Sequence, residues 1–412
     1  MNRTVLRSAR IPDAPDPVSV VVEGGRIAEV GEVATTDNDV IIDVGGRAVL
    51  PAFADLHIHL DKAGLYWHDD QASADEIDRL RWASDRTIRL KERMSVSSII
   101  ERATDVARAM ARRGTTAMRT HVDVDTVIGL RGVEALLEVR DRLRDEIDLQ
   151  VSVLPTESGW HHGGPGMNLV QAALKLDVDA IGGATGFVDD PEFYVPTVFD
   201  LAEQAGVAVD LHVDESDDPG LLVLEDVARL TLERQMVGRV VAGHCSTLSL
   251  ASAEDAQRVI DLVVQAQVTI VAMPMTNLYL LGGPRGPRGM TRLKDLLRSG
   301  ALLACASDNQ QDAFTPYGNG DLLQVAALAG IVGQVGSPRE QQQLIASITE
   351  VPRAALGTAP GVVEVGGGGD LVVLDTLDPA RVLAVQPPVH MVIRSGRVQS
   401  ASATYEDVGS AR

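Results

Sequence analysis

Histidine, which binds metal ions and exchanges protons near neutral pH, recurs at short spacing in this chain. His57 and His59 stand one residue apart in the stretch Pro51-Ala-Phe-Ala-Asp-Leu-His-Ile-His-Leu-Asp-Lys62. Apolar and polar residues alternate toward its end, which indicates a strand. Because alternate residues of a strand share one face, the two imidazoles can close on one divalent metal. Alone the pattern is weak, since surface strands and ordinary cores also contain His-x-His.

Further histidines strengthen the case for a metal site. Five of the nine histidines lie at or near the carboxyl end of a predicted strand, namely His57, His59, His121, His212 and His244. Asp308 ends another predicted strand in the same way. A single histidine at a strand end is usually structural, but four strands ending in histidine and one in aspartate rarely arise by chance. Such donors suit zinc, with iron or manganese as alternatives. A metal with three histidines and one aspartate keeps a position for water, which it acidifies.

Glu215 is the candidate proton carrier. It follows His212 by three residues, in a run that continues as Ser216-Asp217-Asp218. Asp217 and Asp218 fit a solvated acidic loop. Glu215, next to a candidate ligand, is better placed to pass protons to and from a substrate nitrogen. Asp214 fits a purely structural role equally well.

Alternating strands and helices must position these side chains. The central region contains eight strand-like runs: Val49–Leu60, Thr116–Val122, Leu149–Pro155, Ala180–Ala184, Val207–Asp214, Val240–His244, Val268–Pro274 and Leu302–Asp308. The segments between them show helical periodicity, with one apolar stripe from Ile100 to Met110 and a capping pattern at Ser252-x-x-Asp255. Eight strand–helix units predict an α/β fold of the (β/α)8 TIM-barrel type, whose catalytic residues lie at the carboxyl ends of the strands. A doubly wound open sheet is the alternative. Residues 72–94 form an extra helical insertion, which we interpret as a lid.

Both ends of the chain are rich in short β segments. Near the amino end these are Val18–Val22, Arg26–Val30 and Val40–Val44, and near the carboxyl end Asp370–Asp375 and His390–Arg394. Gly24-Gly25 indicates a hairpin between the first two. We therefore predict a small β-sandwich domain from residues 1–50 plus 360–412, attached to a metal-dependent barrel domain of residues 51–359. The glycines from Gly366 to Gly369 predict a flexible hinge between the two.

Composition narrows the class of protein. The 412 residues are 45% hydrophobic and 23% charged, which is typical of a soluble globular protein. The net charge of −21 argues against nucleic acid and against anionic membranes as partners. The amino terminus lacks the apolar core of a signal peptide, and Cys245 and Cys305 lie in apolar runs unsuited to disulfides. We expect a cytoplasmic protein, and a homo-oligomer stays open.

Taken in order, these motifs resemble the amidohydrolase superfamily, on its cytosine deaminase-like branch, over nearly the whole chain. The matching segments are His57-Ile-His59-Leu-Asp61, Arg119-Thr-His121-Val-Asp123, His212-x-Asp214-Glu215, His244, Pro274-x-x-Asn277-Leu278 and Asp308. Several motifs in the correct order make the resemblance specific.

The resemblance implies one divalent metal held by His57, His59, His212 and Asp308. It implies that His244 orients the attacking water, that Glu215 protonates the ring nitrogen beside the attacked carbon, and that Asp308 accepts the proton from the water. The implied activity is metal-dependent hydrolysis of a C–N bond in an amino-substituted nitrogen heterocycle, pyrimidine- or triazine-like, by metal-bound hydroxide with release of ammonia or an amine. Binuclear relatives have a lysine ending the fourth strand. Asp179–Thr185 contains none, so a single metal is expected.

The sequence departs from cytosine deaminases at residues that are expected to contact the substrate. Thr156 stands where those enzymes have glutamine, Asn309 where they have a second aspartate, and Phe314 where they have tryptophan. Since a threonine hydroxyl cannot match the geometry of an amide, cytosine is a doubtful main substrate. Lys62 and Asp308-Asn309 are more similar to the group that includes N-isopropylammelide isopropylamidohydrolase.

The residues predicted to contact the substrate are Lys62, Thr156, Asn309, Phe314 and His121. For Lys62, a contact with a ring carbonyl or anionic ring stands against a plain surface cation. His161-His162, with Trp160, lie after the third strand and either line the pocket or form a solvated loop.

Two other functions stay open at this stage. The same metal-activated water could open a cyclic amide or imide, in which case the amine stays attached to the product. Alternatively, the chain is a non-catalytic binding protein on the same fold. The missing lysine of the fourth strand counts against the first, and the complete set of ligand and acid–base residues counts against the second.

Overall fold

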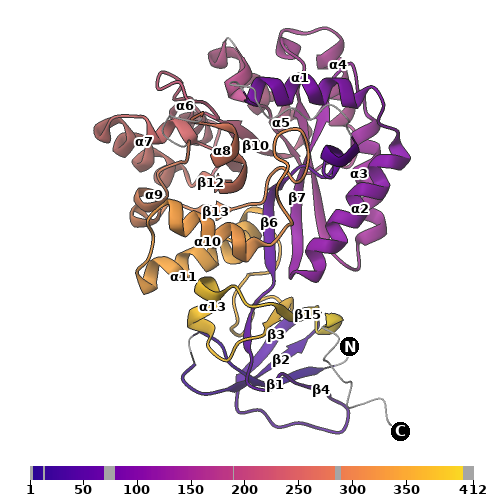
Figure 1. The fold of residues 1–412 in the computed structure, drawn as a ribbon, viewed down its shortest axis with the longest axis vertical. Helices are drawn as coiled ribbons and strands as arrows, with labels where there is room; N and C mark the ends of the chain where they lie inside the picture. The colour runs from indigo at the N-terminus through magenta and orange to yellow at the C-terminus, as the bar shows by residue number, and fades with distance from the viewer. Residues whose placement is uncertain (1–2, 13, 69–78, 189, 284–288, 402–412) are drawn as a thin grey trace.

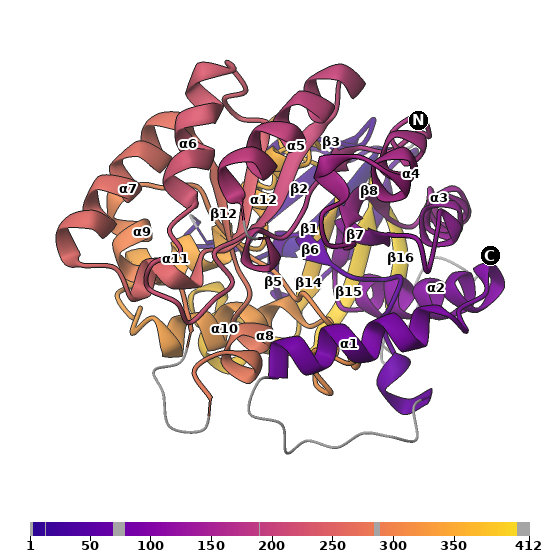
Figure 2. The same ribbon diagram turned by 90° about the horizontal axis from the view of Figure 1, so that it is seen from above.

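The central architecture is a sheet of eight parallel strands surrounded by helices (Figures 1 and 2). The computed structural model describes residues 3–12, 14–68, 79–188, 190–283 and 289–401. The strands, each parallel to its neighbours in the chain, are β6 (Phe53–Ile58), β7 (Thr115–Val124), β8 (Asp148–Pro155), β9 (Ala180–Ile181), β10 (Ala208–Val213), β11 (Val240–His244), β12 (Thr269–Ala272) and β13 (Leu303–Cys305).

The sheet closes into a barrel between its first and last strands. Ile58 pairs with Asp308 in parallel register, and the Asp308 amide donates to the carbonyl of His57 at 2.9 Å. This closure confirms the predicted TIM barrel over the open doubly wound sheet. It also places the backbone of two candidate ligands side by side.

Helices alternate with the strands and form the outer ring seen in Figure 2. They are α2 (Val96–Arg112), α3 (Arg131–Leu143), α4 (Pro165–Ala173), α5 (Pro191–Ala205), α6 (Leu224–Glu233), α7 (Ala253–Ala266), α9 (Leu293–Ser299) and α10 (Leu322–Val332). In α2 the side chain of Ser95 caps the first turn. Ala103, Ala107 and Met110 of the predicted stripe are buried, whereas Ile100 and Val106 are half-buried against the core. The predicted capping at Ser252 is also present, at the start of α7.

The remaining helices lie at strand ends or outside the ring. They are α1 (Arg79–Lys91), α8 (Pro274–Leu280), α11 (Pro338–Ala346), α12 (Glu350–Ala355), α13 (Val382–Val385) and the short 3-10 helices η1 (Leu65–His68), η2 (Trp160–His162), η3 (Thr185–Phe187), η4 (Ser246–Ser249) and η5 (Pro379–Arg381). The helix α1 belongs to the predicted insertion, of which residues 72–78 lie outside the described residues.

Strands from both chain ends form two further sheets, one ordered β3-β2-β1-β4 and the other β16-β15-β14-β5. Their bounds are β1 (Thr4–Ala9), β2 (Val18–Glu23), β3 (Arg26–Gly31), β4 (Val40–Asp43), β5 (Ala48–Pro51), β14 (Leu371–Leu374), β15 (Val389–Arg394) and β16 (Arg397–Ala401). Apolar side chains of both sheets share one buried cluster, which includes Leu6, Val20, Val373 and Ile393. The sandwich built from both termini is thus confirmed. The residue limits of the two domains stay a prediction, and residues 402–412 lie outside the described residues.

Two sequence predictions are corrected here. The run from Val49 to Leu60 is not one strand: β5 pairs with β14 in the terminal sandwich, and β6 begins the barrel after Ala52. The glycines from Gly366 to Gly369 are not a flexible hinge, since their amides donate to carbonyls of Ile27, Glu364, Pro360 and Gly25 respectively. A Cβ on Gly367 would lie 2.3 Å from the Val362 carbonyl oxygen, so close packing of backbone requires glycine there.

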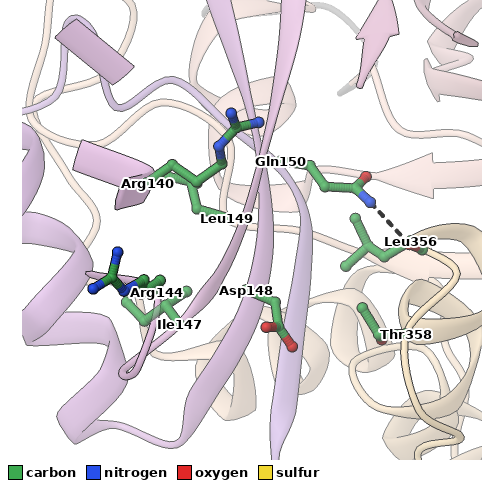
Figure 3. Close-up of a pocket in the computed structure, with 8 residues that line it drawn as sticks. All are labelled: Arg140, Arg144, Ile147, Asp148, Leu149, Gln150, Leu356 and Thr358. Atoms are coloured by element: carbon green, nitrogen blue, oxygen red, sulfur yellow. Dashed lines mark hydrogen bonds between the residues drawn. The ribbon is translucent and has the colours of Figure 1, made fainter. Parts of the chain in front are cut away.

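The two ends of the barrel differ in surroundings. Because β5 leads directly into β6, the amino ends of the barrel strands face the terminal sandwich, below the barrel in Figure 1, and the carboxyl ends point away from it. A pocket of about 210 Å³ at the amino end of β8 contains Asp148, Gln150 and Thr358 (Figure 3). Asp148 is paired there with Arg394 of β15, which joins the barrel to the sandwich. Gln150 donates to the carbonyl of Leu356, which follows α12.

Within the described ranges, no helix is long and apolar enough to cross a membrane. Both cysteines are free and buried, as predicted.

Candidate active site at the carboxyl end of the barrel

The predicted metal ligands come together at the carboxyl ends of β6, β10 and β13. Nε2 of His59 lies 3.3 Å from Oδ1 of Asp308 and 3.3 Å from Nε2 of His212. Nε2 of His57 lies 3.6 Å from the same Asp308 oxygen. All four side chains are buried. Residues separated by up to 251 positions in the chain therefore present nitrogen and oxygen donors to one point.

These donors fit a divalent cation. In the part of the chain that the structure describes, both ring nitrogens of His57, Nδ1 of His212 and both carboxylate oxygens of Asp308 are buried without a hydrogen-bond partner. Leaving a buried polar group unpaired costs about 1–3 kcal/mol, so a cluster of such groups is expected to have an ionic partner. Imidazole with carboxylate is a donor set typical of zinc, iron and manganese.

The protonation states favour metal binding. Burial, followed by the neighbouring imidazoles, lowers the pKa of His57 and of His212 well below its usual value. These rings are therefore neutral and offer lone pairs. Burial opposes the charged form of Asp308, but the rings of His59 and His244 outweigh it and lower the pKa of its carboxyl group. The neutral imidazoles of His57 and His212 thus lie beside the carboxylate of Asp308.

The backbone is strained where the site is formed. His244 and Asp308 have φ values of 65° and 58°, in the left-handed region that non-glycine residues seldom adopt. His244 is the last residue of β11, and Asp308 lies three residues after β13. Gly243 makes room for this arrangement, since a Cβ there would lie 3.3 Å from Nδ1 of His57.

Glu215 and His244 lie beside the cluster, and their catalytic roles stay a prediction. Nδ1 of His244 is 3.4 Å from Oε1 of Glu215 and 2.9 Å from Nδ2 of Asn277 in α8. Burial first, and then the nearby Asp308 carboxylate, raise the pKa of Glu215 well above its usual value. Glu215 therefore carries a proton that it can donate. Burial lowers the pKa of His244 to about 4, so this ring is neutral.

Asp214 has the structural role that the sequence left open. Its two carboxylate oxygens accept the amides of Val223 and Leu224 at 2.9 and 3.0 Å, which holds the loop after β10. This loop carries Glu215.

Lys62 is not a surface cation. Its side chain is 4% exposed, and Nζ lies 2.7 Å from Oδ1 of Asp123 and 3.1 Å from Nδ1 of His59. Burial lowers its pKa, but the charges of Asp123 and Asp61 more than compensate and raise it. Lys62 therefore stays charged and lies behind a candidate ligand.

Lys91, the last residue of α1, shares the carboxylate of Asp123 with Lys62. Its Nζ lies 2.8 Å from Oδ2 of Asp123, 2.6 Å from Asp125 and 3.0 Å from the hydroxyl of Thr156. An ammonium group has three N–H donors, and these three oxygens satisfy all of them. The three buried residues Lys62, Asp123 and Lys91 thus join the inserted helix to the loop of His59.

The other predicted substrate contacts occupy different surroundings. Thr156 is exposed at the end of β8, but its hydroxyl also donates to Asp125 at 2.7 Å. Asn309 is buried and donates to Asp312 at 2.7 Å, whereas Phe314 is half-buried on the same loop. His121 is fully buried, with its ring stacked on that of His57 at 3.9 Å between centroids. Their role as substrate contacts stays a prediction.

Sequence reasoning missed Lys91 as a supporting residue, and it named Asp123 and Asn277 only as members of matching motifs, without a role. Only four of the 37 basic residues are lysine, and two of these are buried beside the site. That rarity was a usable signal for Lys91. The contacts of Asp123 and Asn277 join segments distant in sequence and leave no local pattern.

Comparisons with known proteins agree with this geometry. A family model described as "Amidohydrolase family" matches residues 90–399. The chain is 30% identical to the pterin deaminase of Rhizobium rhizogenes, covering 92% of this chain and 87% of the relative. It is 28% identical to the N-isopropylammelide isopropyl amidohydrolase of Pseudomonas sp. strain ADP, covering 96% of both. The crystal structure of 5-methylcytosine deaminase from Klebsiella pneumoniae with 5-fluorocytosine superimposes with a TM-score of 0.87 at 26% identity over 98% of both chains.

Proposed function

The chain belongs to the amidohydrolase family, a family of metal-dependent hydrolases, and from this premise we propose that it removes ammonia or an amine from an amino-substituted nitrogen heterocycle. The observation that carries the proposal is the convergence of unpaired buried imidazole nitrogens and the Asp308 carboxylate beside Glu215, a carboxyl group whose pKa is raised by burial. Metal ligands and a proton donor at one barrel end are what hydrolysis of a C–N bond needs.

We propose that His57, His59, His212 and Asp308 hold one divalent ion, with zinc as the first choice and iron or manganese as alternatives. When bound, such an ion supplies a water of lowered pKa, so that hydroxide is available near neutral pH. No lysine ends β9, which supports a single ion.

Proton transfers fall to the chain's own residues. Glu215 donates a proton to the ring nitrogen beside the attacked carbon, which makes that carbon more electrophilic. Asp308 accepts the proton of the attacking water and then gives it to the leaving nitrogen. As the C–N bond breaks, the deprotonated Glu215 takes the proton of the new hydroxyl group and is restored. His244 orients the water, and Asn277 holds the His244 ring for this purpose through the 2.9 Å contact.

The substrate class follows from the relatives. Those with 26–30% identity act, by their names, on pterin, N-isopropylammelide and 5-methylcytosine, which are all planar nitrogen heterocycles with an exocyclic nitrogen. We propose a substrate of this class for the present chain, with Asn309 and Phe314 in its pocket.

A panel assay tests the proposal. The metal-loaded enzyme is incubated with pterin, cytosine, 5-methylcytosine and N-isopropylammelide, and released ammonia or isopropylamine is measured. We expect release from at least one member. Loss of substrate with neither product would instead indicate ring opening, because the amine then stays attached.

A further inference from the structure

We propose a second cation site at the barrel mouth, formed by His161, His162 and Asp190 and specific for a divalent transition-metal ion such as zinc. It is separate from the cluster of His57, His59, His212 and Asp308. The first two residues belong to η2, after β8, and Asp190 precedes α5, after β9. Both segments follow barrel strands at the carboxyl end.

The donors already face one another. Nε2 of His161 lies 2.8 Å from Oδ1 of Asp190, and Nε2 of His162 lies 3.0 Å from Oδ2. One oxygen or nitrogen from each residue lies within 4.8 Å of the others. Two imidazoles and one carboxylate therefore converge on a single point.

The orientation of Asp190 is not that of a helix cap. This residue occupies the N-cap position of α5, where an aspartate normally accepts backbone amides of the first turn. Its side chain makes no such hydrogen bond and points both oxygens at the two imidazoles instead. The carboxylate is thus committed to the histidines.

Packing holds the histidines in place. The side chain of His161 is only 2% exposed, and its ring lies edge-on to Tyr194 at 4.9 Å between centroids. The ring of His162 stacks on Phe193 at 5.3 Å with an interplanar angle of 12°. Because packing already restricts the two rings, binding of an ion costs little further side-chain entropy of the histidines.

The dimensions suit a small transition-metal ion. Ligand bonds of about 2.0–2.2 Å in tetrahedral geometry separate neighbouring donors by roughly 3.3 Å, so the present contacts need to open by only about half an ångström. Asp190 can make this small movement, since its side chain is 39% exposed and caps no backbone amide. The open side admits water as the remaining ligand. Imidazole donors disfavour magnesium and calcium.

Zinc stoichiometry tests this site independently of catalysis. Metal-free full-length protein is dialysed against zinc, and bound zinc is counted for the wild type and for Asp190→Asn and His162→Gln. We expect two ions per chain in the wild type and one in each variant. Asp226→Asn, which removes a surface carboxylate paired with Arg229 on α6, is the matched control and should keep two. Magnesium in place of zinc should not bind at this site.

The outcomes separate this site from the proposed active site. If the active-site cluster does not bind zinc, the wild type binds one ion and Asp190→Asn binds none, and the second site still stands. If Asp190→Asn and His162→Gln bind as much zinc as the wild type, these residues form only hydrogen bonds with one another, and the proposal is overturned.

Discussion

At the residue scale, two buried carboxyl groups at the barrel mouth have pKa values shifted in opposite directions. The pKa of Glu215 is raised by burial and by Asp308, whereas that of Asp308 is lowered by the histidines around it. In enzymes, two titratable groups whose pKa values are shifted apart commonly act as the proton donor and the proton acceptor. We therefore assign proton donation to Glu215 and proton acceptance to Asp308 in the proposed mechanism.

Glu215→Gln removes the proton but keeps the shape of the side chain. We expect turnover to fall by about 10²–10⁴-fold, the usual contribution of a general acid, with metal content unchanged. The measurement is kcat together with bound metal per chain. Activity equal to that of the wild type would remove Glu215 from the proposed mechanism.

Asp123→Asn tests the buried pair of lysines. The substitution leaves Lys62 and Lys91 with one neutral partner between them, and breaking a buried ion pair costs about 3–5 kcal/mol. Urea unfolding of the metal-free protein measures the loss. Asp226→Asn, on the surface, should lose about 1 kcal/mol or less. Equal losses of unfolding free energy in the two variants would show that the buried contacts of Asp123 with the lysines stabilise the fold no more than a surface ion pair does.

At the scale of single elements, α1 is held to the barrel through its last residue. Lys91 contacts both Asp123 and Asp125, which lie on or next to β7. In Lys91→Met the buried carboxylates lose this cation, and we expect faster amide hydrogen exchange in α1. The helix α7, which lies elsewhere on the ring, is the internal control. Unchanged exchange in α1 would mean that other contacts dock it.

A capping box at the start of α11 gives a pH-dependent prediction. The carboxylate of Glu340 accepts the amides of Ser337 and Gly336, and these bonds lower its pKa to about 2 from its usual 4.5. A folded-state pKa below the unfolded one stabilises the fold above pH 4.5, and this stabilisation disappears as pH falls toward 2.

The comparison of wild type with Glu340→Gln checks this prediction. The difference in unfolding free energy between them should be constant from pH 7 to about 5 and shrink below pH 4.5. A difference independent of pH over this range would contradict the assignment.

At the scale of the whole molecule, the fold was predictable because its signals are local and repeated. Apolar runs ending in histidine or aspartate marked barrel strands, and their order fixed which residues meet at the carboxyl end. The break at Ala52 was not visible, since the apolar run continues through it while the chain passes from the sandwich to the barrel. The structure of Gly366 to Gly369 was also not predictable, because a run of glycines is compatible both with a flexible hinge and with close packing of backbone.

In the candidate site, too, some residues were predictable from local sequence motifs and others were not. The proposed ligands and Glu215 stand in motifs at strand ends and were visible in the sequence. The contacts of Lys91 with Asp123 and of Asn277 with His244 were not, because each joins segments more than 30 residues apart. Long-range contacts of this kind follow from the closed barrel and not from any local pattern.

The central claim is that one divalent ion, held by His57, His59, His212 and Asp308, is required for hydrolysis of the C–N bond. The most direct measurement titrates zinc into metal-free Asp190→Asn, which lacks the second proposed site, while amine or ammonia release is followed. We predict no release without metal, and activity that rises to a plateau at one zinc per chain. Release that persists undiminished in the metal-free protein, or that needs a second equivalent, would contradict the account.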